Sequence, residues 1–229
     1  MIQEAGRLFR VFVAPGEVFR EIREKPTWGL GFLLFWALGA LSAYLLLARV
    51  DFIEVLESQF TASGRPVPPN LDQSAGMAHG CAMVFSAIGP PIICLLIAAI
   101  FLAMRLFGGD FNFRQSLAIT VHGLMPRTAA ALVSIPVILS RDHFSAQEMK
   151  TASFLFSNLG FLAPENAAPW LSTLLVSLDV FTLASLVLLS LGYHIAGKVP
   201  RSRAFLSVFG LWLVSVAVQV GLAAMQGLR

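Results

Sequence analysis

Two charged residues, Arg127 and Asp179, lie deep within long apolar stretches of the sequence. A charge inside a membrane span is costly and normally faces a polar partner, so such residues are candidates for a functional site. The arginine side chain has five N–H donors and no acceptor, so it could bind a carboxylate and a backbone carbonyl together. The chemistry open to this pair is ion pairing or the lining of a polar pathway.

The positions of the two charges along their stretches predict similar depths in a membrane. At 1.5 Å per residue, Arg127 lies about 18 Å before the end of its stretch at Leu139, and Asp179 lies about 13.5 Å after the start of its own at Trp170. An arginine side chain could span this difference. Two interpretations stay open: a gated polar pathway near the bilayer midplane, or a buried ion pair that fixes helix register.

Other polar and helix-breaking residues fall near the same depth. His122 lies about one turn from Arg127 and could relay a proton, although a lone histidine is more often a helix-to-helix hydrogen bond. Ser86 precedes Gly89-Pro90-Pro91, where the prolines leave backbone carbonyls without intrahelical donors. The predicted polar constellation is Arg127, Asp179, His122 and Ser86, and the predicted kinks are at Gly89, Pro90, Pro91, Pro126 and Pro136.

Recognisable catalytic and metal-binding patterns are missing from the sequence. It has no HExxH, GxSxG or Walker motif, and its histidines and two cysteines, Cys81 and Cys94, lack the spacing of a metal site. We therefore expect a protein that is not an enzyme, with no catalytic residues, no cofactor and no bound metal.

The composition is that of a membrane protein. Hydrophobic residues make up 57% of the 229 residues and charged residues only 13%, against roughly 25% charged in soluble domains. Backbone polar groups must be satisfied within each segment in lipid, so the spans must be helices. The predicted fold class is all-α, a polytopic membrane helix bundle. Its transmembrane domain, 29–229, has five spans at about 29–47, 81–104, 117–139, 170–193 and 204–225.

Basic residues predict the orientation of these spans. Ten of the sixteen Lys and Arg residues lie on one side of the membrane: before span 1, in the loop between spans 2 and 3, or in the loop between spans 4 and 5. Five lie in the loops and terminus on the opposite side, and the sixteenth, Arg127, lies within a span. The positive-inside rule then places the N-terminus in the cytoplasm and the C-terminus outside. The net charge of +3 is spread along the chain, which argues against nucleic-acid binding.

Residues 1–28 are predicted to form one or two amphipathic helices at the cytoplasmic membrane interface. Phe9, Phe12, Phe19 and Ile22 fall on the apolar faces, and Pro26 ends the helix. The segment could anchor the first span, or it could dock a partner protein, because helix-in-groove sites share this pattern.

The second exterior loop also carries a helix signal. Ser145 and Glu148 have capping-box spacing ahead of an apolar run that reaches Leu159, which predicts a short helix on the outer leaflet.

Several motifs resemble the bacterial branch of the Yip1 family. They are the run from Ala14 to Trp28, Gly108-Gly109 followed by Phe113-Arg114-Gln115, Pro126, and Leu178-Asp179-Val180-Phe181-Thr182 leading to Gly192. The resemblance covers nearly the whole chain. It implies a five-helix protein of the bacterial cytoplasmic membrane with a cytoplasmic N-terminus and no known catalysis.

The resemblance also bears on partners. Eukaryotic relatives bind prenylated Rab GTPases, but the N-terminal segment here has only 28 residues, so Rab binding does not carry over. An accessory role beside an envelope transporter has been suggested within the bacterial branch. We expect a binding, scaffolding or accessory component that contacts membrane lipids and a membrane-protein partner or a second copy of itself. The alternative is a small transporter or lipid-handling protein that uses Arg127 and Asp179.

Overall fold

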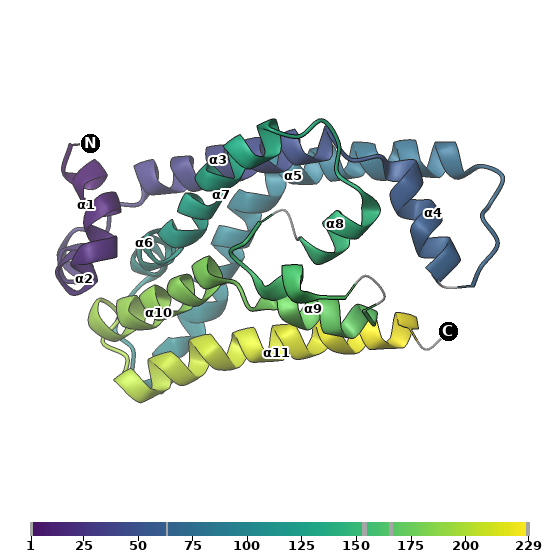
Figure 1. The fold of residues 1–229 in the computed structure, drawn as a ribbon. Helices are drawn as coiled ribbons and strands as arrows, with labels where there is room; N and C mark the ends of the chain where they lie inside the picture. Colours follow the sequence, from purple (N-terminus) through teal and green to yellow (C-terminus); the bar gives the residue numbers. More distant parts are fainter. Residues whose placement is uncertain (1, 63, 153–154, 165–166, 228–229) are drawn as a thin grey trace. The chain divides into compact units, whose positions relative to one another are not determined.

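The computed structural model describes residues 2–62, 64–152, 155–164 and 167–227, and these residues form helices and connecting loops. Apart from two isolated bridges, this part of the chain has no β-structure, so the all-α prediction is confirmed. The elements, shown in Figure 1, are α1 (Ile2–Val13), α2 (Pro15–Glu24), α3 (Gly29–Leu47), α4 (Phe52–Ala62), α5 (Leu71–Phe101), η1 (Leu102–Phe107), α6 (Phe113–Gly123), α7 (Met125–Leu139), α8 (Ala146–Thr151), η2 (Leu159–Leu162), α9 (Pro169–Ser177), α10 (Val180–Ile195) and α11 (Arg201–Gly227).

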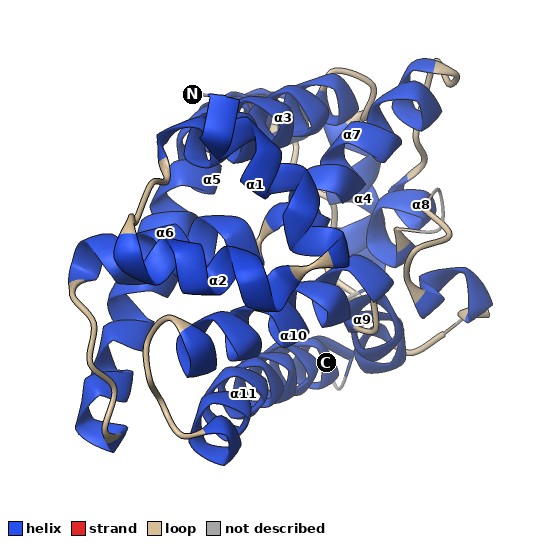
Figure 2. Cartoon of the chain, turned by 90° about the vertical axis from the view of Figure 1, so that its left-hand side faces the viewer, coloured by secondary structure: helices blue, strands red, loops and turns tan. Residues whose placement is uncertain are grey.

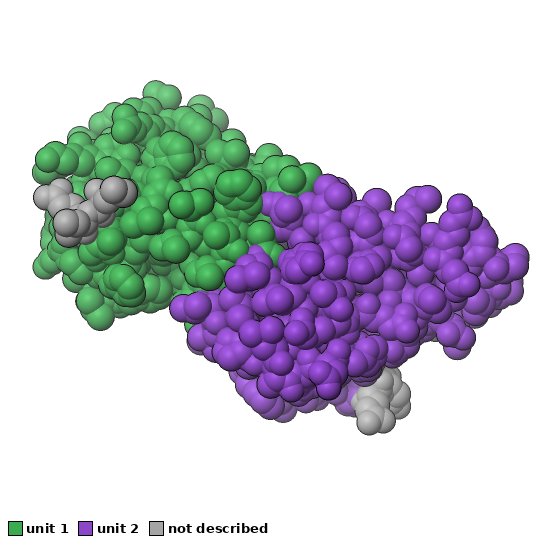
Figure 3. Space-filling view, turned by 90° about the horizontal axis from the view of Figure 1, so that it is seen from above, with its two compact units in different colours: residues 1–40, 88–131, 181–213 green, residues 41–87, 132–180, 214–229 purple. Residues whose placement is uncertain are grey.

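The chain forms two compact units, which are coloured separately in Figure 3. Unit 1 comprises Met1–Ala40, Ile88–Ala131 and Phe181–Leu213. Unit 2 comprises Leu41–Ala87, Leu132–Val180 and Val214–Arg229.

Three of the described helices are long and apolar enough to cross a membrane: Gly29–Leu47, Leu71–Phe107 and Arg201–Met225. The first begins and ends at the residues predicted for span 1. The bent pair α6 and α7 makes a fourth if it counts as one span, whereas α10 is apolar but shorter. A multi-pass helical protein is thus supported, and the number five stays a prediction.

The predicted span 117–139 is divided into α6 and α7, which meet at Leu124 with a bend of 40°. Pro126 accounts for the break, because it has no N–H to donate to the His122 carbonyl and its ring crowds the preceding turn. The Leu124 N–H donates to the Thr120 carbonyl at 2.9 Å and closes α6. Pro136, in contrast, lies inside α7, which continues past it.

The predicted span 170–193 is also interrupted. α9 ends at Ser177 and α10 begins at Val180. The Val180 N–H donates to the carbonyl of Ser157, a loop residue, at 2.8 Å. The Val180 N–H therefore keeps a hydrogen bond although the helix is interrupted before it.

α5 continues as one helix through Pro90 and Pro91, where the sequence predicted a kink. Gly39 of α3 lies against this point: a Cβ placed there would be 3.4 Å from Pro90 Cγ. The small residue therefore permits close approach of the two helices, as small residues do between membrane helices.

Unit 1 contains the larger core. Its buried residues come from α1, α2, α5, η1, α6, the start of α7, α10 and α11 and from the loops beside them. The largest completely buried side chain is Tyr193 of α10, whose ring contacts Phe101 and Phe111.

Unit 2 has a smaller core around Ile138 and Phe144. The capping box beside it is confirmed: Ser145 Oγ accepts from the Glu148 N–H, and Glu148 Oε2 accepts from the Ser145 N–H. α8 ends at Thr151, earlier than predicted, where Ala152 adopts a left-handed conformation with φ of 46°. Phe154, part of the predicted helix, lies outside the described residues.

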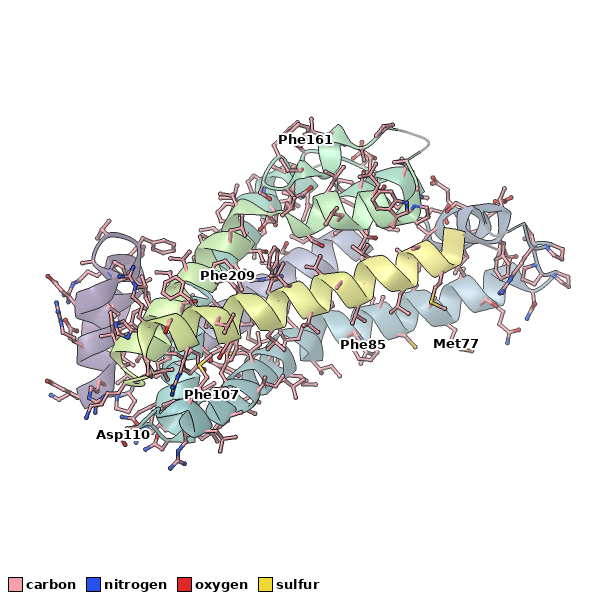
Figure 4. The ribbon with its side chains drawn as sticks, turned by 90° about the horizontal axis from the view of Figure 1, so that it is seen from below. Met77, Phe85, Phe107, Asp110, Phe161 and Phe209 are labelled. Carbon is pink, nitrogen blue, oxygen red and sulfur yellow. The ribbon has the colours of Figure 1, made fainter. Side chains whose placement is uncertain are left out.

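The unit 2 part of α5 presents apolar side chains outward. Met77 and Phe85, labelled in Figure 4, are each 66% exposed. Such exposure is expected of a helix face that contacts lipid.

Candidate functional site

The N-terminal segment is a helical hairpin of α1 and α2, joined at Ala14 (Figure 2). Pro15 occupies the first turn of α2, where its missing N–H costs no helical hydrogen bond. α2 packs on α1 and on α6, and its apolar residues Val18, Phe19 and Ile22 are completely buried. The hairpin is therefore part of the core of unit 1.

The Phe19 ring requires a glycine on the facing helix. A Cβ at Gly192 of α10 would lie 2.7 Å from Phe19 Cε1 and 2.6 Å from Ile119 Cγ2, closer than real carbon contacts allow. Gly192 thus makes the space into which α2 docks. The sequence contained this glycine but gave no sign of its role.

The predicted apolar face of the segment is divided. Phe19 and Ile22 are buried in the protein, whereas Phe9 is 78% and Phe12 50% exposed. The expectation that all four residues lie in the membrane interface is corrected for Phe19 and Ile22, because α6 and α10 cover them. Phe9 and Phe12, with the 83% exposed Val13, stay on the surface. We call Phe9, Phe12 and Val13 the exposed edge.

A buried arginine holds the hairpin closed. Arg7 Nε donates to Glu21 Oε2 at 2.8 Å, and Arg7 Nη1 donates to the Lys25 carbonyl and to Thr27 Oγ1, both at 3.0 Å. Arg7 is only 6% exposed. Its three partners lie on α2 and on the linker to α3, so this one side chain fixes α1 against both.

A second arginine extends this network at the surface. Arg10 pairs with Glu21 at 2.8 Å and with Glu17 at 2.9 Å. The hydrogen bond from Arg7 lowers the pKa of the Glu21 carboxyl below its ordinary value of 4.5, and Arg10 adds to the effect.

The lowered pKa of Glu21 predicts acid sensitivity of the hairpin. A carboxyl whose pKa is lower in the folded state stabilises that state above pH 4.5, and the contribution is lost as the pH falls through the folded pKa. Pepsin cleavage of the hairpin in inverted membrane vesicles should therefore rise as the pH is lowered below 4.5. Glu21→Gln should flatten this pH dependence. The exposed Glu24, replaced by glutamine, is the control and should not.

Other polar contacts fasten α2 to the neighbouring turns of unit 1. Arg23 donates to the Ala196 carbonyl at 3.1 Å and lies 3.5 Å from Asp110, which also pairs with Lys198 at 3.5 Å. Gln115 Nε2 donates to the Arg23 carbonyl at 3.2 Å. Asp110, labelled in Figure 4, thus pairs with two cationic side chains from separate segments, Arg23 and Lys198.

A surface pocket of about 520 Å³ lies where the hairpin leads into α3. Glu4 of α1 borders it, and Glu4 Oε1 accepts from the Leu30 N–H at 2.9 Å. This bond satisfies one of the free donors in the first turn of α3. The lining residues are Glu4, Pro26, Thr27, Trp28, Gly29, Phe113, Arg114 and Leu117.

A buried polar cluster lies inside unit 1 and was not predicted. The Tyr193 hydroxyl is 2.8 Å from Ser116 Oγ and 3.0 Å from Thr120 Oγ1, and Ser116 Oγ donates to the Ala98 carbonyl at 2.6 Å. The only sequence signal was the four-residue spacing of Ser116 and Thr120. These bonds join α5, α6 and α10.

The predicted polar constellation falls in both units. Arg127, in unit 1, is exposed and donates to Thr182 Oγ1 at 3.3 Å. Asp179, in unit 2, forms an isolated bridge with Asn158. The ion pair between Arg127 and Asp179 stays a prediction.

The other two members of the constellation make local hydrogen bonds. His122 is completely buried in unit 1, with Nδ1 2.8 Å from the Ala118 carbonyl, and Nε2 has no partner within the described part of the chain. In unit 2, Ser86 Oγ donates to the Met83 carbonyl at 2.7 Å. The sequence did not predict either local bond.

The predicted ion pair can be tested by a double-mutant cycle on the free energy of unfolding in detergent. If Arg127 and Asp179 pair, Arg127→Gln and Asp179→Asn together should cost less than the sum of the single losses, with a coupling of about 0.5 to 3 kcal/mol. Additive losses would show that the two side chains do not interact.

The described residues contain no cluster of side chains that could coordinate a metal ion. No group of three or more His, Cys, Asp or Glu side chains among them is close enough to hold an ion. The arrangement at the hairpin instead offers an exposed apolar edge and a pocket with charged groups, both suited to binding.

Comparison with known proteins identifies the family of the chain. The model of the Yip1 domain matches residues 9–223, which include α2 to α10 and most of α11. The chain belongs to the Yip1 domain family. This places it among multi-pass helical membrane proteins.

Two relatives extend the comparison. Membrane protein YknW of Bacillus subtilis is 26% identical over 221 residues, covering 92% of this chain and 88% of that protein. Uncharacterized protein MJ0794 of Methanocaldococcus jannaschii is 28% identical over 119 residues, covering 52% of this chain and 75% of that protein. No solved structure shows a significant match to this Yip1-domain chain.

Proposed function

We propose that this Yip1-family protein is a non-enzymatic accessory component that binds another membrane protein through its N-terminal hairpin. The observation that supports this is a hairpin anchored in the core of unit 1, with an exposed apolar edge. Arg7 and Phe19 fix the hairpin in unit 1, whereas Phe9, Phe12 and Val13 extend from it.

This anchoring favours binding by such a surface. A preorganised helix loses little conformational freedom on association, so more of the contact energy appears as affinity. The linker to α3 is short, which keeps the exposed edge close to the membrane boundary. The surface is therefore suited to a partner that is itself in the membrane.

Site-specific photo-crosslinking tests the proposal. A benzophenone side chain at Phe12 should yield one protein adduct in native membranes, and Phe9→Asp in the same chain should abolish it. The same probe at Arg20, an exposed polar position on α2, is the control and should not give that adduct. Adducts to lipid alone at Phe12 would contradict the proposal and favour a membrane anchor.

A small transporter or lipid-handling protein is the second candidate. Two predicted spans are interrupted, at Leu124 and at Leu178-Asp179, and broken helices often form transporter sites. Arg127 follows the first break and is exposed. In proteoliposomes, transfer of a fluorescent phospholipid between leaflets that is lost in Arg127→Gln would favour this candidate over the accessory role.

We infer a bacterial cytoplasmic-membrane location with the N-terminus inside and the C-terminus outside, supported by the distribution of basic residues. Single cysteines in a background lacking Cys81 and Cys94 test this. The four positions are Ala5, Arg65, Lys150 and Leu228. An impermeant maleimide added to intact cells should label all of them except position 5. Labelling at position 5 would place the N-terminus outside and contradict the inferred orientation.

A further inference from the structure

The pocket at the start of α3 is lined by two side chains of opposite charge, Glu4 and Arg114, that can still bind a ligand. Glu4 uses Oε1 to accept from Leu30, and Oε2 has no partner among the described residues. Arg114 is exposed, and the described part of the chain provides it with no hydrogen bond or ion pair. By contrast, Arg7 and Glu21 nearby are paired with each other. The pocket therefore offers one anionic and one cationic group to a ligand.

The remaining wall of the pocket is largely apolar. Trp28, Phe113 and Leu117 line it together with the two charged residues. Trp28 immediately precedes α3, the first candidate span, and tryptophan is enriched at the level of the lipid headgroups. The pocket therefore lies at the depth where a headgroup joins its acyl chains.

We propose that this pocket binds the headgroup of a zwitterionic aminophospholipid, phosphatidylethanolamine. Arg114 binds the phosphate, because a guanidinium forms strong charge-assisted hydrogen bonds with phosphate oxygens. Glu4 Oε2 accepts from the headgroup ammonium, which has three N–H donors. Trp28, Phe113 and Leu117 contact the glycerol and the upper acyl chain. This site does not depend on the partner proposed for the exposed edge.

The chemistry of the two charges predicts a specificity. Phosphatidylglycerol has the phosphate but no cation, so it gains from Arg114 and not from Glu4. Phosphatidylcholine has a cation without N–H donors, so Glu4 attracts it but cannot hydrogen-bond with it. Phosphatidylethanolamine should therefore bind more tightly than either of the other two lipids.

Native mass spectrometry of the purified full chain, titrated with each of the three lipids, tests the proposal. Arg114→Gln should weaken the binding of all three, by about tenfold for phosphatidylethanolamine. Glu4→Gln keeps an oxygen acceptor for Leu30 and should remove only the preference for phosphatidylethanolamine. Arg105→Gln and Glu24→Gln change exposed residues outside the pocket and should leave binding unchanged.

Two results would overturn the assignment. An unchanged ratio of phosphatidylethanolamine to phosphatidylglycerol in Glu4→Gln would remove Glu4 from the site. Soluble phosphoethanolamine that binds as tightly as the lipid would show that the acyl chain makes no contact with the apolar wall. Thermal unfolding of each variant distinguishes a lost site from a lost fold.

Discussion

Phe19→Ala should detach the hairpin from unit 1, whereas Phe12→Ala should leave it in place. Phe19 is completely buried and Phe12 is half exposed, so only the first substitution empties space in the core. Replacing a buried phenylalanine by alanine costs about 3 to 5 kcal/mol. In inverted membrane vesicles, trypsin should then cleave Phe19→Ala at Arg20 and Arg23, and Phe12→Ala should resist as the unaltered protein does.

A substitution on the facing helix provides an independent check. Gly192→Val places carbon atoms where the Phe19 ring lies, so it should also expose the trypsin sites. Equal cleavage of Phe12→Ala and Phe19→Ala would contradict the structure, because it would mean that the two rings have equivalent surroundings. In the structure, Phe19 is buried in the protein and Phe12 is exposed.

The second large effect is expected from Arg7→Met. The substitution removes the donor of three hydrogen bonds and leaves the Lys25 carbonyl without that partner. The loss should destabilise the closed hairpin by about 3 kcal/mol. Arg10→Met is the matched control, because the Arg10 side chain is 43% exposed and its ion pairs lie in water. The measurement is again trypsin cleavage in inverted vesicles.

The double variant Arg7→Met/Glu21→Gln separates the ion pair from simple loss of packing. If the two residues act as a pair, the double variant should be less destabilised than the sum of the single variants. Equal destabilisation by Arg7→Met and Arg10→Met would contradict the role assigned to the buried arginine.

Some features of this fold are encoded locally, within a single continuous segment of the sequence. The apolar stretches predicted helices and a membrane setting because hydrophobic length is a property of a continuous segment. The bounds of α3, the Ser145 capping box and the break near Pro126 depend on residues within one turn of each other. Such features can be read from the sequence without knowing the fold.

Only the tertiary structure decided the surroundings of each amphipathic face. Phe12 and Phe19 have the same residue type and both lie on apolar faces, yet one is exposed and the other buried. Removing an apolar side chain from water is favourable whether lipid or protein receives it, so periodicity cannot distinguish the two. What decides the outcome is a distant residue, Gly192, whose missing side chain leaves room for Phe19. The Arg7 contacts and the pairing of Glu4 with α3 are likewise set by packing between separate helices, over sequence separations of 14 residues for Arg7 and Glu21 and 26 for Glu4 and Leu30.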